Sequence, residues 1–309
     1  MSKIPYYFYY FILLSLPLLS SSTPIFPTIL ILSTPTNSTH SEINSNFVRW
    51  LQASGADVLP VRPGEEVEKI DFFLTKVNGI LFQGNLGPLD FDSDYYKTAN
   101  YIINKVELIY RTQRIKIPVL VIGDDMAMVL CILNNNSPVH SEIPLFKSAS
   151  TLFPFIPPYN TLILSELESS DIKIAAEKQL IANQLTKVIN LEFIKNKIKS
   201  NSFFEIVASF PINGENYVSI LEGTEKPLVM ISFHPEMIAF ENRDEFEIPN
   251  ELEAVKMSRF IGNAFVFYGR KNVPVEVTVE EKEKLGYIDP YGELPEGKEG
   301  RYSYFFEKK

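Results

Sequence analysis

One short segment of the chain carries a residue pair that could act in hydrolysis. In Phe233-His234-Pro235-Glu236, a histidine is followed two residues later by a carboxylate. In an extended segment this spacing puts both side chains on one side, so Glu236 could orient His234 as a base is oriented in a catalytic triad. A plain loop after a strand is the alternative interpretation of the same four residues.

A second segment, residues 118–130, has the layout of a nucleophile elbow. It predicts a buried strand, a tight turn with small residues at Gly123 and Ala127, and the start of a helix. Such a turn holds one reactive side chain at the end of a sheet. The N–H of Met126 would then help to hold an oxyanion. Asp125 stands at the tip, where a thiol or hydroxyl is expected; in an ordinary turn, one of the two aspartates would cap the helix.

A third segment, residues 79–85, closes a predicted strand with Gly84-Asn85. A glycine just past a strand lets the backbone turn an N–H towards a ligand. An ordinary strand-end turn is the alternative. These two residues are therefore candidates for an oxyanion or ligand site.

The elements that must position these segments are indicated by apolar runs and by helical spacing. Strand–helix alternation in the first half predicts a parallel sheet with helices on both faces. We expect one α/β domain over residues 25–273 and a charged, aromatic tail over 274–309 that is part of the same domain. The predicted strands are 27–33, 56–61, 77–82, 119–122, 162–164, 204–210, 217–221 and 228–232, and the predicted helices are 42–54, 95–111 and 251–268.

In chain order the segments are the strand that ends in glycine, the elbow and then His-Pro-Glu. In this order they resemble the class I glutamine amidotransferase-like fold, and within it the gamma-glutamyl hydrolases, which trim the glutamate tails of folates. The resemblance extends from about Pro27 to Asn272 and includes Ala53-Ser54-Gly55-Ala56. In the tail, Ile288-Asp289-Pro290-Tyr291 and Tyr302-Ser303-Tyr304-Phe305 look like the aromatic C-terminus of the family. The resemblance implies a doubly wound, mostly parallel sheet in a flavodoxin-like three-layer sandwich.

The resemblance also implies a cysteine-type omega peptidase, with a Cys at the elbow, a His that activates it and a Glu behind the His. His234 and Glu236 match the last two, but Asp125 occupies the Cys position. The Gly-Gly pair of the family is Gly84-Asn85 here. A second His of the family corresponds to Leu185.

These departures favour a catalytically inactive member that keeps the fold and a cleft for a gamma-glutamyl or folate-like small molecule. Attack by the Asp125 carboxylate on an amide would form a mixed anhydride, and its charge would repel an oxyanion. Cys131 lies six positions further, about 9 Å along a helix, and is interpreted as a small buried residue. Two alternatives stay open. One is an active hydrolase in which Asp125 holds a water and His234 shuttles protons. The other is an interaction protein whose tail docks on a partner.

The N-terminus predicts a targeting segment. Lys3 precedes an apolar run over residues 4–19 and then Ser20-Ser21-Ser22, the pattern of a signal peptide over residues 1–22. The rival interpretation is a signal anchor, but the run is shorter than the ~20 residues that a membrane span needs. We therefore expect the secretory pathway, with a destination outside the cell or in a lysosomal or vacuolar lumen.

Passage through the secretory pathway would make Asn37 a glycan site, since Asn37-Ser38-Thr39 is an acceptor motif. Asn135 is a weaker candidate because Pro138 follows its motif.

Composition limits the class of partner. The 309 residues carry a formal charge of −9, which argues against nucleic acid, because phosphate binding needs a basic face. Cys131 is the only cysteine, so no intrachain disulfide can form. No cofactor and no metal site is predicted. A small molecule, a second copy of the chain and a protein bound at the tail remain as expected partners.

Overall fold

The computed structural model describes residues 26–201, 204–241, 247–272, 277–288 and 302–307. Its centre is an eight-stranded sheet in which the first five strands in spatial order run parallel and the last three are joined by antiparallel pairing. This confirms the predicted mostly parallel sheet. The spatial order is β4 (Asp57–Val61), β1 (Thr28–Leu32), β5 (Gly79–Phe82), β6 (Val119–Ile122), β12 (Leu228–Ile231), β11 (Glu215–Gly223), β10 (Phe204–Ile212) and β8 (Phe153–Pro154). The predicted signal peptide lies outside the described residues.

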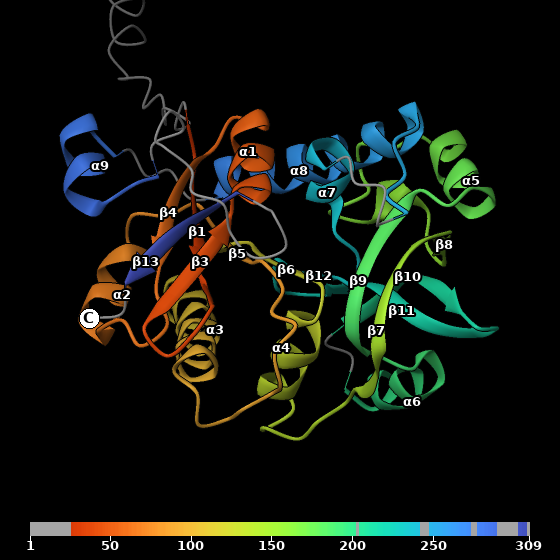
Figure 1. Ribbon diagram of the computed structural model, residues 1–309, viewed down its shortest axis with the longest axis horizontal. Helices are drawn as coiled ribbons and strands as arrows, with labels where there is room; N and C mark the ends of the chain where they lie inside the picture. Colours follow the sequence, from red (N-terminus) through yellow and green to blue (C-terminus); the bar gives the residue numbers. More distant parts are fainter. Residues whose placement is uncertain (1–25, 202–203, 242–246, 273–276, 289–301, 308–309) are drawn as a thin grey trace, which may run out of the picture.

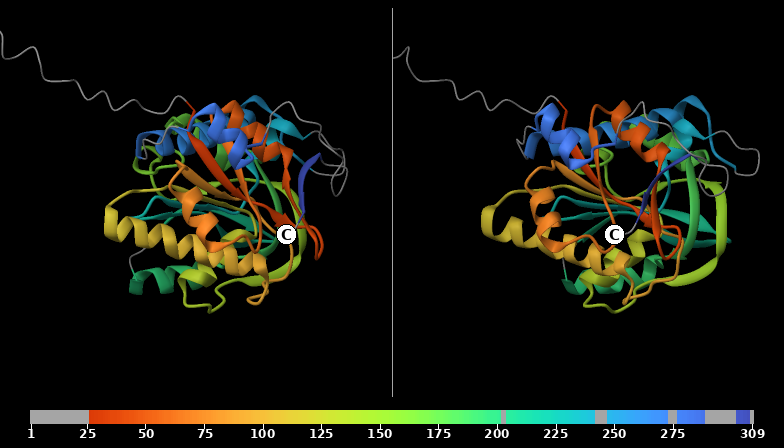
Figure 2. Two further views of the ribbon diagram at one scale, coloured as in Figure 1. Left: turned by 90° about the vertical axis from the view of Figure 1, so that its left-hand side faces the viewer. Right: turned by 60° about the vertical axis from the view of Figure 1, so that its left-hand side comes forward.

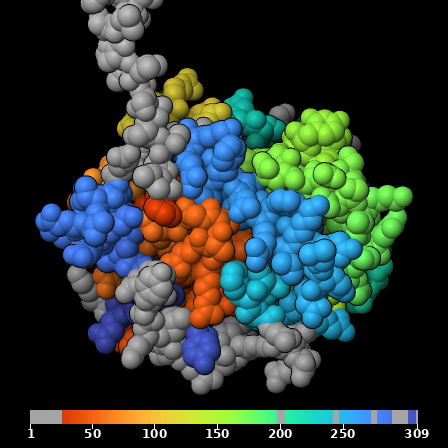
Figure 3. All heavy atoms as spheres, turned by 90° about the horizontal axis from the view of Figure 1, so that it is seen from above, coloured from red at the N-terminus to blue at the C-terminus, as the bar shows by residue number. Residues whose placement is uncertain are grey.

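Helices cover both faces of the sheet, and each face has its own hydrophobic core (Figures 1 and 2). The apolar strands β1, β5, β6 and β12 are buried along their whole length because they are covered from both sides. One face carries α2 (Val67–Leu74), α3 (Asp94–Gln113), α4 (Asp125–Leu133) and α6 (Leu191–Asn201). The other carries α1 (Ser45–Ala53), α5 (Ser169–Glu177), α7 (Pro235–Phe240) and α8 (Leu252–Asn272), and Figure 3 looks onto this layer.

Two small ribbons stand beside the main sheet. β7 (Ser141–Ser150) pairs with β9 (Ile181–Val188), and β3 (His40–Asn44) pairs with both β2 (Thr34–Pro35) and β13 (Ser303–Glu307). None of the described helices has both the length and the apolar character that crossing a membrane would require.

Two element predictions were wrong, and each has a physical reason. The helix expected from residue 42 begins at Ser45, because residues 40–44 form β3 with partners at the far end of the chain. The strand expected at 162–164 is absent. There the amides of Leu162 and Ile163 donate to the two carboxylate oxygens of Glu222, at 2.8 and 2.9 Å, instead of to a neighbouring strand.

The described part of the tail folds back on the domain. Helix α9 (Val279–Leu285) is held by the Lys76–Glu281 ion pair at 2.9 Å. The hydroxyl of Tyr287 lies 2.9 Å from that of Thr28, and β13 completes the ribbon at β3. The described parts of the tail, residues 277–288 and 302–307, therefore pack against the rest of the domain.

Candidate active site

The three segments singled out in the sequence converge where β5, β6 and β12 end. Gly84 and Gly123 both have positive φ, at 90° and 59°, and the imidazole of His234 packs against them. A Cβ placed on Gly123 would lie 2.7 Å from Nε2 of His234, and one on Gly84 would lie 3.2 Å from its Cε1. Any side chain at these two positions would therefore displace the histidine.

His234 and Glu236 are paired as predicted, with 2.9 Å between Nδ1 and Oε1. Both residues are buried, and the ring of Phe47 meets the imidazole edge-on. The local backbone differs from the extended segment that we expected, because Pro235 starts α7 directly after His234. Proline is favoured in the first turn of a helix, where its missing N–H is not needed. Glu236 therefore reaches His234 from the first turn of a helix.

Asp125 is held by donors of its own. Its Oδ2 accepts hydrogen bonds from the N–H of Gly84 at 2.9 Å and from the hydroxyl of Tyr95 at 2.6 Å. Burial raises the pKa of this carboxyl to about 6, although Tyr95 and the backbone amides of Gly84 and Asn85 act to lower it. The amides that we assigned to an oxyanion thus contact the carboxylate of Asp125.

The elbow has the predicted order of strand, turn and helix. The residue with positive φ is Gly123, and Asp125 is simply the first residue of α4. The N–H of Met126, expected to hold an oxyanion, donates to the carbonyl of Gly123 at 3.1 Å. Because the helix starts at once after the glycine, this amide is used inside the first turn.

Two cavities open at this edge of the sheet, and they separate the candidate residues. The first, here the His234 cavity, has a volume of about 280 Å³ and is lined by His234, Glu236 and Gly84 among others. The second, here the Asp125 cavity, has about 270 Å³ and is lined by Asp125, Tyr95, Asp124 and Lys187 among others. Asn85 and Gly87 line both cavities. His234 and Asp125 therefore line two neighbouring cavities that share part of their walls.

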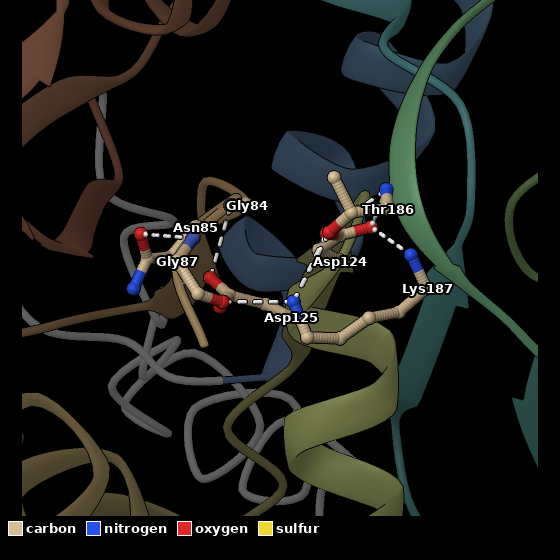
Figure 4. A network of polar contacts seen from close by, with 7 residues as sticks. All are labelled: Gly84, Asn85, Gly87, Asp124, Asp125, Thr186 and Lys187. Carbon is tan, nitrogen blue, oxygen red and sulfur yellow. Dashed lines mark hydrogen bonds and ion pairs between the residues drawn. The ribbon is translucent and has the colours of Figure 1, made fainter. Parts of the chain in front are cut away.

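A buried ion pair fixes this arrangement, and sequence reasoning missed it. The carboxylate of Asp124 accepts hydrogen bonds from Thr186 and from the backbone of Lys187, and Nζ of Lys187 lies 3.2 Å from its Oδ2. The same Nζ donates to the carbonyl of Gly87 at 2.8 Å, so Lys187 reaches from β9 to the loop (Figure 4). The side chains of Lys187 and Asp124 are only 5% and 0% exposed. In the sequence, Lys187 is a single lysine in a predominantly polar stretch, and nothing near it predicts an ion pair with Asp124.

The remaining predicted positions are placed as follows. Leu185 is fully buried in the core on β9, while its neighbour Gln184 lines the His234 cavity. Cys131 is buried, as expected, and burial raises the pKa of its thiol. Asn37 and Asn135 are exposed. Within the described ranges there is no group of three or more His, Cys, Asp or Glu side chains that could hold a metal ion.

Comparison with known proteins agrees with this architecture. No family model matches the sequence. The gamma-glutamyl hydrolase of Mus musculus is 24% identical over 236 residues, which is 74% of this chain and 72% of that protein. Gamma-glutamyl hydrolase 2 of Arabidopsis thaliana is 26% identical over 236 residues, 75% of this chain and 66% of that one. The gamma-glutamyl hydrolase of Homo sapiens is 24% identical over 248 residues, 78% of this chain and 75% of that one.

Solved structures agree on the fold. A protein from Thermoplasma acidophilum, described as part of a GMP synthase, has a TM-score of 0.50 at 13% identity, over 79% of this chain and 94% of that one. PurLQS from Thermotoga maritima has a TM-score of 0.50 at 10% identity, over 79% of this chain and 99% of that one. The sheet and the helices on its two faces define a protein of the class I glutamine amidotransferase-like fold. Within that class, the chain is similar in sequence to gamma-glutamyl hydrolases.

Proposed function

We propose that this chain is a family member that does not hydrolyse gamma-glutamyl bonds and that keeps the His234 cavity as a binding site. The observation that carries the proposal is the hydrogen bond from the Gly84 amide to the Asp125 carboxylate, at 2.9 Å. A donor that stabilises an oxyanion must be available where charge develops in the transition state. Here a carboxylate of the protein itself occupies that donor.

The separation of Asp125 from His234 supports the same proposal. Nucleophilic catalysis requires the nucleophile and its base to lie within hydrogen-bond reach. Asp125 lines one cavity and His234 lines the other. The hydrogen bonds of Oδ2 to Gly84 and Tyr95 hold Asp125 in its cavity. Asp125 thus stands at the family's Cys position without the geometry of a nucleophile.

One observation favours a second candidate, an active hydrolase of altered mechanism. With its pKa raised to about 6, Asp125 would exchange a proton in mildly acidic surroundings, where general acid–base catalysis is efficient. In that case Asp125 would hold a water and His234 would move protons. This candidate requires the loop beginning at Gly84 to open, since the two residues line different cavities.

The names of the relatives suggest a gamma-glutamyl ligand for the retained cavity, and the family resemblance adds a folate-like one. The N-terminal pattern and the exposed Asn37 motif support a route through the secretory pathway, ending outside the cell or in a lysosomal or vacuolar lumen. Docking of a partner on the tail has less support, because the described part of the tail packs on its own domain.

The test is a hydrolase assay on the chain without residues 1–22, with a gamma-glutamyl dipeptide and a folyl polyglutamate as substrates and released glutamate as the readout. We expect no turnover above the rate of a His234→Ala control. Turnover that is abolished by both His234→Ala and Asp125→Asn would overturn the proposal in favour of the altered mechanism. Turnover that survives Asp125→Asn would overturn both candidates, because it would require a different nucleophile.

A further inference from the structure

Two carboxylates on different secondary-structure elements line the His234 cavity. Glu236 belongs to α7 and is 1% exposed, whereas Glu42 belongs to β3 and is partly buried. Oε1 of Glu236 bonds to His234, but its Oε2 has no hydrogen-bond partner among the described residues. The same holds for Oε2 of Glu42. A buried carboxylate oxygen without a donor is costly, so both oxygens indicate a missing donor.

Apart from His234, the remaining polar lining is neutral. Among the described residues around the cavity, amides and hydroxyls are frequent and no Lys or Arg side chain is found; the neutral polar ones are Thr34, Asn44, Gln83, Asn85, Gln184 and Ser303. Like charges at close range repel, most strongly where water is excluded. A ligand with several carboxylates would therefore be repelled by Glu236 and Glu42, and a ligand with a positive charge would be attracted.

We infer that the His234 cavity takes a compact ligand that presents a protonated amino group to Glu236 and Glu42. The inference rests on the proposed function, because it names the ligand class of the same retained cavity. A volume of about 280 Å³ is near the lower end of the range for small-molecule sites, so it favours a small ligand. Amide groups of the ligand would pair with the Asn and Gln side chains of the wall.

This inference restricts which gamma-glutamyl compounds are expected to bind in the cavity. A glutamate joined through its side-chain carboxyl to a neighbour keeps a free α-amino group when it stands at the amino end. In a folyl polyglutamate every glutamate nitrogen is acylated, and each residue adds an α-carboxylate. The cavity therefore favours a simple gamma-glutamyl amide over a polyglutamate chain.

Three probes of similar size and different charge test the inference by titration followed by NMR at pH 7. They are 4-aminobutanamide, which is cationic, pentanamide, which is neutral, and glutaric acid monoamide, which is anionic. We expect the cationic probe to bind at least about tenfold more tightly than the neutral one, because hydrogen bonds to charged groups are the stronger ones. The anionic probe should bind most weakly.

Two isosteric variants test whether Glu236 and Glu42 cause the preference for the cationic probe. Glu236→Gln and Glu42→Gln should each reduce the preference for the cationic probe to less than about threefold, since each removes one charge-assisted hydrogen bond. Glu280→Gln is the matched control, because that side chain is 78% exposed on α9 and pairs only with Lys284. It should leave the preference unchanged. If Glu236→Gln does not fold, Glu42→Gln carries the test alone.

Equal binding of the three probes, tighter binding of the anionic probe, or no binding of the cationic probe to the folded protein would each overturn the inference. None of these results would restore hydrolysis, so the proposed function would stand. Conversely, turnover in the hydrolase assay would overturn the proposed function and leave the charge preference intact.

Discussion

The carboxylate of Asp125 accepts a hydrogen bond from the backbone N–H of Gly84, with 2.9 Å between the two atoms. The bond joins the start of α4 to the loop that follows β5. Tyr95 of α3 donates to the same oxygen, so one carboxylate connects three elements. At the start of α4 the chain thus has an internal anchor.

The anchor makes stability depend on pH. Burial raises the pKa of Asp125 from 3.8 to about 6, so folding favours the protonated form. The stabilisation is fully present below pH 3.8 and is lost as the pH rises through 6. Relative to Asp125→Asn, which does not titrate, the free energy of unfolding of the natural chain should fall by roughly 2 kcal/mol between pH 4 and 7. Urea denaturation at constant ionic strength measures the free energy of unfolding of both proteins. A difference between them that stays constant from pH 4 to 7 would contradict the prediction.

Replacing the anchor with the family nucleophile should not create an enzyme. Asp125→Cys restores a thiol, but the position lines the Asp125 cavity and not the His234 cavity. We expect glutamate release by this variant to equal that of Asp125→Ser, in which no thiolate can form. Hydrolysis by Asp125→Cys that disappears with His234→Ala would show that the two side chains do meet.

The Asp124–Lys187 pair should be a large contributor to stability. Lys187→Met keeps the length of the side chain but leaves Asp124 buried without its cation, and breaking a buried pair in this way costs about 3 kcal/mol or more. The midpoint of urea denaturation should fall accordingly. Lys284→Met is the control, since that side chain is 71% exposed, and it should change stability by less than about 0.5 kcal/mol. Equal effects of the two variants would refute this role of Lys187.

The last strand should support the wall of the His234 cavity. Removing residues 302–309 deletes β13, which pairs with β3 from Ser303 opposite Asn44 to Glu307 opposite His40. Ser303 itself lines the cavity. We expect a lower thermal midpoint and loss of binding of the cationic probe, whereas removal of residues 308–309 alone should leave both unchanged. Retained binding after the longer deletion would show that the wall does not need β13.

Glycosylation should occur at Asn37 alone. The residue is exposed between β2 and β3, so the acceptor motif is accessible. On secretion from a eukaryotic host, glycosidase treatment should lower the mass of the natural chain and of Asn135→Gln, but not that of Asn37→Gln. A shift that persists in Asn37→Gln would assign the glycan to another residue.

Much of the sheet could be predicted from the sequence, because a buried strand is recognised by the apolar residues within it. The apolar runs of β1, β5, β6 and β12 identify buried strands without knowledge of their neighbours. β3 and β13 could not be found in this way, because each depends on a partner some 260 residues away (Ser303 opposite Asn44). β3 has one apolar residue in five and β13 has three aromatic ones, so the long-range pairing decides the structure of both strands.

The sequence by itself indicated a resemblance to gamma-glutamyl hydrolases, and it predicted the mostly parallel sheet and the pairing of His234 with Glu236 from residues that lie close together in the chain. Only the tertiary structure decided what Asp125 does. Its surroundings come from Gly84 and Tyr95, which lie on other elements, and it lines a different cavity from His234. A side chain's reactivity depends on the donors, charges and burial around it, and the folded chain supplies these from distant positions.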